Sequence, residues 1–339
     1  MKTHWIVMGL IGSITLLILA SCSNNTNEVV VYSSVDQIFS EPILKEFEEK
    51  SSITVKMVFD TEETKSTGVM NRLIAEGRNP QCDLFWSGDP MRNILLKSKG
   101  ITAPLHSIAG SKIPSFAQDK EGHWIGFSAR ARVLLYNKKL IAKEALPQSI
   151  LDLTQPQYDH KFAIANPLFG TTTFHIAAIF SAWGTEKGMQ WLTGLKKNNV
   201  TIATSNGDVK RRVLKGEVAM GLTDTDDAFE AKKENSDVDY LFLDQEKNGL
   251  GSLIMPNALS LIAHSPHPEN GKKLMEYLLS KEVESQLAQS CAQMPLIKGV
   301  KTPKQTPSLE HITPMKIEYE KISHLLPTIQ ERVQSWLEH

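Results

Sequence analysis

The fold class is decided by residues 28–59, which read EVVVYSSVDQIFSEPILKEFEEKSSITVKMVF. The first five residues form a short apolar run with three consecutive valines, which predicts a buried strand. Apolar residues then recur at helical spacing between Phe39 and Glu49, and Thr54 to Phe59 predicts a second strand. The order strand, helix, strand is typical of an α/β unit with a largely parallel sheet.

The same alternation continues along the rest of the chain. We predict further strands at residues 83–86, 131–136, 162–166, 200–203, 218–222 and 253–262, and helices at 68–75, 91–99, 172–183, 209–215 and 268–279. The sequence contains no internal repeat and no low-complexity segment. With 339 residues, the chain is long enough for two α/β lobes.

Composition and charge exclude several classes of protein. The chain is 41% hydrophobic and 22% charged, which argues against a disordered chain and against a multi-span membrane protein. The formal net charge of -1 provides no basic field for a nucleic-acid partner. Three cysteines are too few for a disulfide scaffold. Cys82 and Cys291 could form one disulfide or remain two buried thiols.

The first residues predict export. An apolar stretch without charges runs from Ile6 to Leu19, and the small residues Ala20 and Ser21 then precede Cys22. This ending resembles the lipobox of bacterial lipoproteins, so residues 1–21 are expected to be a signal peptide and Cys22 the lipidated N-terminus. Residues 22–28 would then be a tether. We therefore expect an extracytoplasmic protein that is anchored to a membrane through its lipid.

One helix start has the features of an anion site. Gly170, Thr171 and Thr172 lie where a predicted strand end leads into an apolar helix. Ligands of open α/β sheets bind beyond the carboxyl ends of the strands, and the free N–H groups and dipole of a helix N-terminus favour negative charge. The alternative is that one threonine simply caps its own helix.

Two charged clusters could complete a binding site. Asp224, Asp226 and Asp227 crowd one strand end and repel one another unless a cation or protons intervene, which suits a hard metal or an amine. The alternative is a solvated acidic turn. Arg130 and Arg132 lie two apart on a strand and share one face, where they could bind an anion or pair with structural carboxylates.

The sequence lacks a catalytic constellation. It contains no G-x-S-x-G, no H-E-x-x-H and no P-loop, and its histidines are scattered, with His264 and His267 expected in a solvated loop. We therefore expect no enzyme activity and no catalytic cofactor. The alternatives from other classes are a secreted hydrolase or transferase on the same scaffold, and a sensor or adhesion lipoprotein.

Several blocks, taken in order, resemble the periplasmic solute-binding proteins of ABC importers, specifically the ferric-iron-binding branch (bacterial extracellular solute-binding protein family 1). The blocks are residues 29–34, 83–86, 126–137, 166–172, 221–227 and 254–257. The resemblance implies an α/β fold of type II, with two lobes, each a mixed sheet flanked by helices, joined by crossing hinge strands. It assigns residues 29–127 and 253–310 to the N-terminal lobe, and residues 128–252 and 311–339 to the C-terminal lobe.

The residues that bind the metal in this family are replaced by aspartates in this sequence. The family's histidine after the first strand corresponds to Asp36, its glutamate after the third strand falls near Asp89, and its adjacent tyrosine pair aligns with Asp226 and Asp227. Carboxylates still suit a hard cation but lack the phenolates that favour Fe3+ so strongly. The resemblance therefore implies a metal set of aspartates: Asp36, Asp89, Asp226 and Asp227.

The anion half is kept, because the family's anion-binding helix start corresponds to Gly170, Thr171 and Thr172, with Asn206 nearby. We therefore predict a monomeric importer component that delivers ferric iron, bound with a synergistic anion, to the transmembrane permease subunits. The alternative ligand is a small anionic or zwitterionic solute, such as a phosphonate or an organophosphate, with an amine on the aspartates. The predicted ligand-binding residues are Ser33, Ser34, Asp36, Ser87, Asp89, Arg130, Gly170, Thr171, Thr172, Asn206, Asp226 and Asp227.

Overall fold

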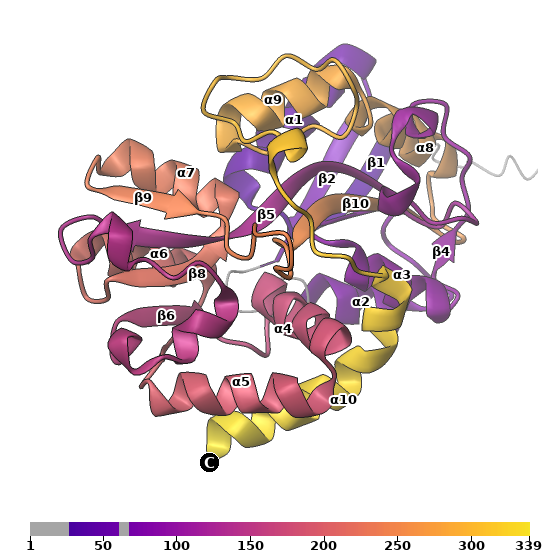
Figure 1. The fold of residues 1–339 in the computed structure, drawn as a ribbon. Helices are drawn as coiled ribbons and strands as arrows, with labels where there is room; N and C mark the ends of the chain where they lie inside the picture. Colours follow the sequence, from indigo (N-terminus) through magenta and orange to yellow (C-terminus); the bar gives the residue numbers. More distant parts are fainter. Residues whose placement is uncertain (1–26, 61–67) are drawn as a thin grey trace, which may run out of the picture.

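The computed structural model describes residues 27–60 and 68–339 (Figure 1). Its strands are β1 (Glu28–Ser33), β2 (Thr54–Phe59), β3 (Leu84–Ser87), β4 (Thr102–Ala103), β5 (Ile125–Asn137), β6 (Phe162–Ala165), β7 (Thr201–Ala203), β8 (Met220–Asp224), β9 (Val238–Leu241) and β10 (Ile254–Ile262). Its α-helices are α1 (Gln37–Ser51), α2 (Gly68–Glu76), α3 (Pro90–Ser98), α4 (Gly170–Trp183), α5 (Thr185–Lys197), α6 (Asn206–Lys215), α7 (Thr225–Glu234), α8 (Pro268–Leu278), α9 (Lys281–Cys291) and α10 (Tyr319–Glu338). The predicted alternation of strands and helices is confirmed.

The strands form one mixed sheet in the order β2-β1-β3-β10-β5-β8-β6-β7. β1 pairs in parallel with β2 and β3, and β6 pairs in parallel with β7 and β8, as expected for α/β units. β10 runs antiparallel to β3 and β5, and β5 runs antiparallel to β8. The sheet thus has two parallel ends joined by antiparallel strands in its middle.

The long strand β5 connects the two ends. Its first half, from Ile125 to Ala131, pairs with β10, and its second half, from Arg132 to Asn137, pairs with β8 and β9. All 13 residues of β5 are buried. A strand that is buried on both faces requires cover from helices on both sides.

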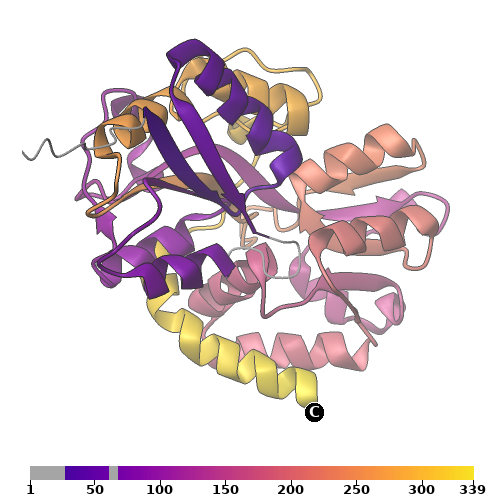
Figure 2. The ribbon, with the colours of Figure 1, turned by 180° about the vertical axis from the view of Figure 1, so that it is seen from behind.

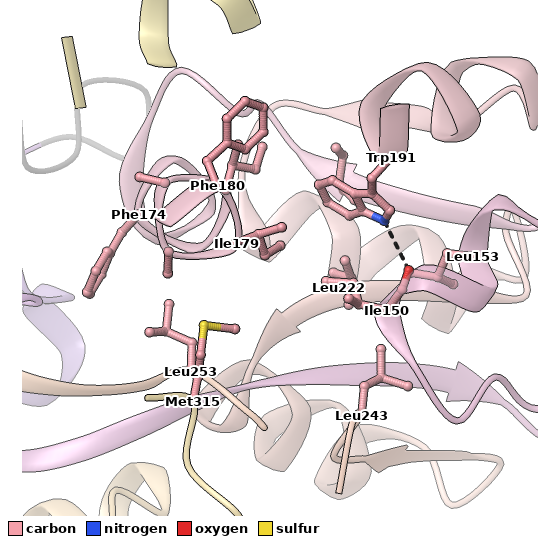
Figure 3. Close-up of a cluster of buried hydrophobic side chains, with 14 of the residues drawn as sticks. Ile150, Leu153, Phe174, Ile179, Phe180, Trp191, Leu222, Leu243, Leu253 and Met315 are labelled. Carbon is pink, nitrogen blue, oxygen red and sulfur yellow. Dashed lines mark hydrogen bonds between the residues drawn. The ribbon is translucent and has the colours of Figure 1, made fainter. Parts of the chain in front are cut away.

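Helices cover both faces of the sheet. Around β1, the buried residues of α1, α8 and α9 pack on one face, and those of α2 and α3 on the other. Around β8, α6 and α7 cover one face and α4 and α5 the other. Figure 3 shows part of the core beneath α4 and α5, where Trp191 donates its indole N–H to the carbonyl of Ile150 at 3.0 Å.

The C-terminal helix α10 crosses this arrangement and contacts both α3 and α4 (Figure 2). Near its end, the indole N–H of Trp336 donates to the carbonyl of Leu192 in α5 at 2.9 Å. α10 therefore packs against helices from both ends of the sheet. Among the described residues, none of the helices combines the length and the apolar character that a membrane span requires.

Candidate functional site

A small cavity of about 70 Å³ lies where the carboxyl ends of strands from both halves of the sheet meet. Every predicted ligand-binding residue except Ser33 and Ser87 lines it. Those two serines shape the neighbouring turns, since Ser33 Oγ accepts from Val35 N and Ser87 Oγ accepts from Asp89 N. The lining residues are Ser34, Asp36, Gly88, Asp89, Arg130, Ala165, Asn166, Phe169, Gly170, Thr171, Thr172, Thr204, Ser205, Asn206, Gly207, Asp224, Asp226 and Asp227.

The N-termini of two helices open onto one wall of the cavity. α4 begins at Gly170, whose φ of 57° is readily adopted only by glycine. Its N-cap residue is Phe169, and no side chain caps it, so the predicted alternative of a threonine that caps its own helix is not observed. α6 begins at Asn206, with Ser205 as its side-chain cap. Free N–H groups at two helix starts make this wall favourable to an anion.

A buried ion pair lies beside the two helix starts. Arg132 Nη1 lies 2.7 Å from Asp224 Oδ1, and both side chains are almost completely buried. Asp224 Oδ2 also accepts from Thr171 Oγ1 at 2.8 Å and from Asn206 Nδ2 at 3.1 Å. Burial tends to raise the pKa of the Asp224 carboxyl, but Arg132 and Arg130 outweigh it and hold the pKa below its usual range. Asp224 therefore stays ionised and ties both helix starts to β5.

Arg130 lies between this network and the remaining carboxylates. Its Nη2 donates to the carbonyl of Gly88 at 2.8 Å, and its Nε lies 3.6 Å from Asp226 Oδ2. Nε is buried and has no hydrogen-bond partner among the described residues. Burial tends to lower the pKa of the guanidinium, but the charges of Asp226 and Asp224 outweigh it and raise the pKa further. Arg130 is therefore a permanent positive charge at the cavity.

Asp226 and Asp227 line the cavity from the first turn of α7. Thr223 Oγ1 donates to Asp227 Oδ2 at 2.7 Å, and Asp227 N donates to Asp226 Oδ1 at 3.1 Å. Burial first, and then the charges of Asp227 and Asp224, raise the pKa of Asp226 to about 8, although Arg130 opposes the shift. Asp224, Asp226 and Asp227 can each offer an oxygen within 4.8 Å of the others. These oxygens could hold a hard cation.

Asp36 and Asp89 come to the cavity from the other half of the sheet. Asp89 Oδ1 accepts from Met91 N at 2.9 Å and caps α3, and Asp36 precedes α1 without capping it. Ser34 lies beside them and accepts from Gly88 N at 3.3 Å. All four predicted metal ligands, Asp36, Asp89, Asp226 and Asp227, line the cavity, but the close group of oxygens among the described residues contains Asp226 and Asp227 with Asp224, and not Asp36 or Asp89.

The remaining predicted residues lie apart from the cavity. Cys82 and Cys291 are buried free thiols, so of the two predicted alternatives the structure shows the unpaired one. Cys22, and with it the predicted signal peptide and almost all of the tether, falls outside the described residues.

The comparisons with known proteins agree with this geometry. The family described as bacterial extracellular solute-binding protein matches residues 43–314. The chain belongs to this family. Its members are solute-binding proteins rather than enzymes, and the predicted membership is confirmed.

Two curated relatives illustrate the range of the family. Iron uptake protein A1 of Synechocystis is 26% identical over 294 residues, which are 83% of this chain and 79% of that protein. A putative 2-aminoethylphosphonate-binding periplasmic protein of Salmonella paratyphi A is 27% identical over 331 residues, which are 95% of this chain and 90% of that protein. Both names describe uptake or periplasmic binding of a small solute, which agrees with the solute-binding family.

Solved structures show the same fold. Iron-bound HitA from Pseudomonas aeruginosa superposes with a TM-score of 0.83 at 24% identity, over 90% of this chain and 99% of that one. A Trichodesmium protein in complex with iron and citrate gives a TM-score of 0.76 at 21% identity, over 91% and 99%. The predicted two-lobed α/β fold is confirmed.

Proposed function

We propose that this protein binds ferric iron together with a small anion outside the cytoplasmic membrane and delivers it to the permease of an ABC importer. The observation that carries the proposal is that three carboxylates whose oxygens lie within 4.8 Å of one another line the same small cavity as two helix N-termini. Carboxylate oxygens suit a hard cation, and the helix starts suit the anion that completes its coordination. The names of the iron-binding relatives support this choice.

The charge of the cavity supports a trivalent cation. Five aspartates line it, and two arginines pair with them, so five negative charges less two positive ones leave a surplus of three when all are ionised. This surplus equals the charge of Fe3+ alone, and the two helix N-termini would balance the charge of the accompanying anion. Burial, and then the charges of Asp227 and Asp224, raise the pKa of Asp226 to about 8, so this carboxyl holds a proton at neutral pH. Ferric iron would displace that proton.

A second ligand is favoured by the separation of charge across the cavity. An aminoalkylphosphonate carries an anionic head, which the helix starts at Gly170 and Asn206 could bind, and an amine, which Asp226 and Asp227 could bind. The relative from Salmonella that is named for 2-aminoethylphosphonate covers nearly the whole chain. This zwitterion is therefore the alternative to iron.

The decisive experiment uses protein that starts at Asn27, so that β1 stays intact. Metal and phosphorus are measured in the purified protein, and titration calorimetry then follows binding of ferric citrate and of 2-aminoethylphosphonate. We expect ferric citrate to bind and Asp226→Ala with Asp227→Ala to abolish its binding. The matched control is Asp239→Ala, an aspartate paired with Lys232 away from the cavity. Binding of 2-aminoethylphosphonate alone would replace iron by the second candidate, and binding of neither probe would reject both.

The cellular setting is part of the proposal. Lipidation at Cys22 would hold a monomeric protein at the outer face of a membrane, where it meets the permease subunits. The predicted lobe boundary between residues 127 and 128 lies in β5, four residues before that strand changes its partner from β10 to β8 between Ala131 and Arg132. Cys22→Ser should release the protein from the membrane fraction, and retention of that variant would reject the lipid anchor.

A further inference from the structure

A β-bulge interrupts the strand β5 two residues before Arg130. Asn257 of β10 pairs with Phe127 and Pro256 pairs with Ala129, so Ser128 has no partner on β10. Ser128 is completely buried and has a φ of 41°, in the left-handed region that a serine seldom adopts. Because this conformation is unfavourable for Ser128 itself, the surrounding residues must hold it.

Glu284 of α9 holds this bulge. Its side chain is completely buried, and its Oε1 accepts from Ser128 N at 3.0 Å and from Leu296 N at 2.9 Å. Its Oε2 accepts from Ile297 N at 2.8 Å. On the other side, Asn257 Nδ2 donates to the carbonyl of Ser128 at 2.6 Å. Side chains therefore bind both backbone groups of Ser128 in place of the sheet.

The next residues of β5 are fixed in the same way. Ala129 exchanges two backbone hydrogen bonds of 2.7 Å with Met294, which lies in the loop that Glu284 also binds. Ala131 N donates to Thr225 Oγ1 at 3.2 Å, one residue before Asp226. Arg130 lies between these two anchors, and its side chain lines the cavity. A bulge bends its strand and redirects the side chains beside it, so the direction of Arg130 depends on the bulge.

We propose that Glu284 is a positioning residue for the ligand site: by holding the bulge at Ser128, it directs Arg130 into the aspartate cluster. Glu284 is not among the residues that line the cavity. It acts through the backbone of Ser128 on Arg130, whose Nε is buried without a hydrogen-bond partner among the described residues. The inference rests on the binding site proposed above, and its test includes a measurement that needs no ligand.

The test compares three variants. Glu284→Gln keeps the size of the side chain but leaves a single acceptor oxygen for three N–H groups. Glu284→Gln combined with Ser128→Gly restores easy access to a positive φ. Leu287→Ala, a completely buried position on the same helix, is the control for lost stability alone. All are measured at a temperature where each variant is folded.

We expect Glu284→Gln to weaken binding of ferric citrate or 2-aminoethylphosphonate about tenfold, the combined variant to regain part of that loss, and Leu287→Ala to bind as the parent does. The ligand-free measurement is solvent exchange of the Arg130 Nε–H, identified as the nitrogen NMR signal that Arg130→Lys removes. We expect exchange to accelerate in Glu284→Gln and not in Leu287→Ala.

Equal affinity and equal exchange in Glu284→Gln and Leu287→Ala would overturn the inference and leave Glu284 a purely structural residue. If the parent binds neither probe, the proposed function fails, and the exchange measurement alone then decides the role of Glu284. The two failures can therefore be told apart.

Discussion

Replacing Asp224 by alanine tests whether the ligand site is built on a buried ion pair. The change removes the carboxylate that binds Arg132 at 2.7 Å, Thr171 at 2.8 Å and Asn206 at 3.1 Å. Arg132 then remains as a buried guanidinium without a counter-charge beside it. Breaking a buried pair from one side costs about 3–5 kcal/mol of folding free energy.

The lower end of that range is expected here. Arg132 keeps hydrogen bonds to the side chains of Thr171 and Asn206 and to the carbonyl of Leu222. We therefore expect Asp224→Ala to lower the free energy of unfolding by about 3 kcal/mol. Asp227→Ala, at a half-buried position of the same cluster, should cost about 1 kcal/mol.

Urea unfolding followed by tryptophan fluorescence measures both values. A third variant combines Asp224→Ala with Arg132→Met, and it should recover much of the lost stability because no unpaired charge remains. The reasoning is refuted if Asp224→Ala unfolds within about 1 kcal/mol of the parent, or if adding Arg132→Met destabilises the protein further.

Three further predictions concern titratable groups. Burial, and then the charge of Arg132, lower the pKa of His175 to about 3. Below pH 6.5, the histidine is therefore protonated in the unfolded chain and stays neutral in the folded protein. The free energy of unfolding should therefore decrease as the pH is lowered, by up to about 1.4 kcal/mol per pH unit from this group. Between pH 6.5 and 4, the free energy of unfolding of His175→Leu should depend less steeply on pH than that of the parent. Because the pKa of Asp226 is about 8, this carboxyl holds a proton below that pH, and a cation must displace the proton in order to bind. Calorimetry should therefore show ferric citrate affinity rising with pH up to about 8, a slope that Asp226→Asn should remove. Burial raises the pKa of the Cys82 and Cys291 thiols, so a thiol reagent should label neither in the native protein and both in urea; labelling without urea would contradict this.

Much of the fold could be predicted because each element carries its own local signal. The three valines after Glu28 and the apolar spacing between Phe39 and Phe47 give β1 and α1 within one or two residues of their observed bounds. The polar strand ends were also predictable, since ligands of such sheets collect at the carboxyl ends of strands. Most of the candidate site follows from that rule.

The partners of individual charges could not be predicted. Arg130 and Arg132 share a strand face in the sequence pattern, but nothing local indicates that Arg132 meets Asp224 at 2.7 Å while Arg130 donates to Gly88. Asp224 was part of the predicted acidic cluster, yet its role in joining α4 and α6 to β5 depends on contacts far apart in sequence. Such pairs arise only when the sheet assembles.

The histidines in the loop after β10 also show that the partners of a side chain are not predictable from local sequence. His264 is exposed, as predicted, but the expectation for His267 was wrong. Its ring Nδ1 lies 3.0 Å from Asp83 Oδ2, and its backbone N–H donates to Asp83 Oδ1 at 2.6 Å. A loop sequence alone does not reveal that a buried aspartate just before β3 lies beneath it.

The C-terminal helix α10 covers one side of the molecule, so the fold depends on its presence. Its buried face, formed by Tyr319, Ile322, Leu326, Ile329, Val333 and Trp336, spans about 26 Å over helices from both ends of the sheet. A chain cut before Tyr319 would leave those helices uncovered, and such truncations should be insoluble. Pro327, which offers no backbone N–H to the helix, is where α10 would bend most easily if the halves moved apart.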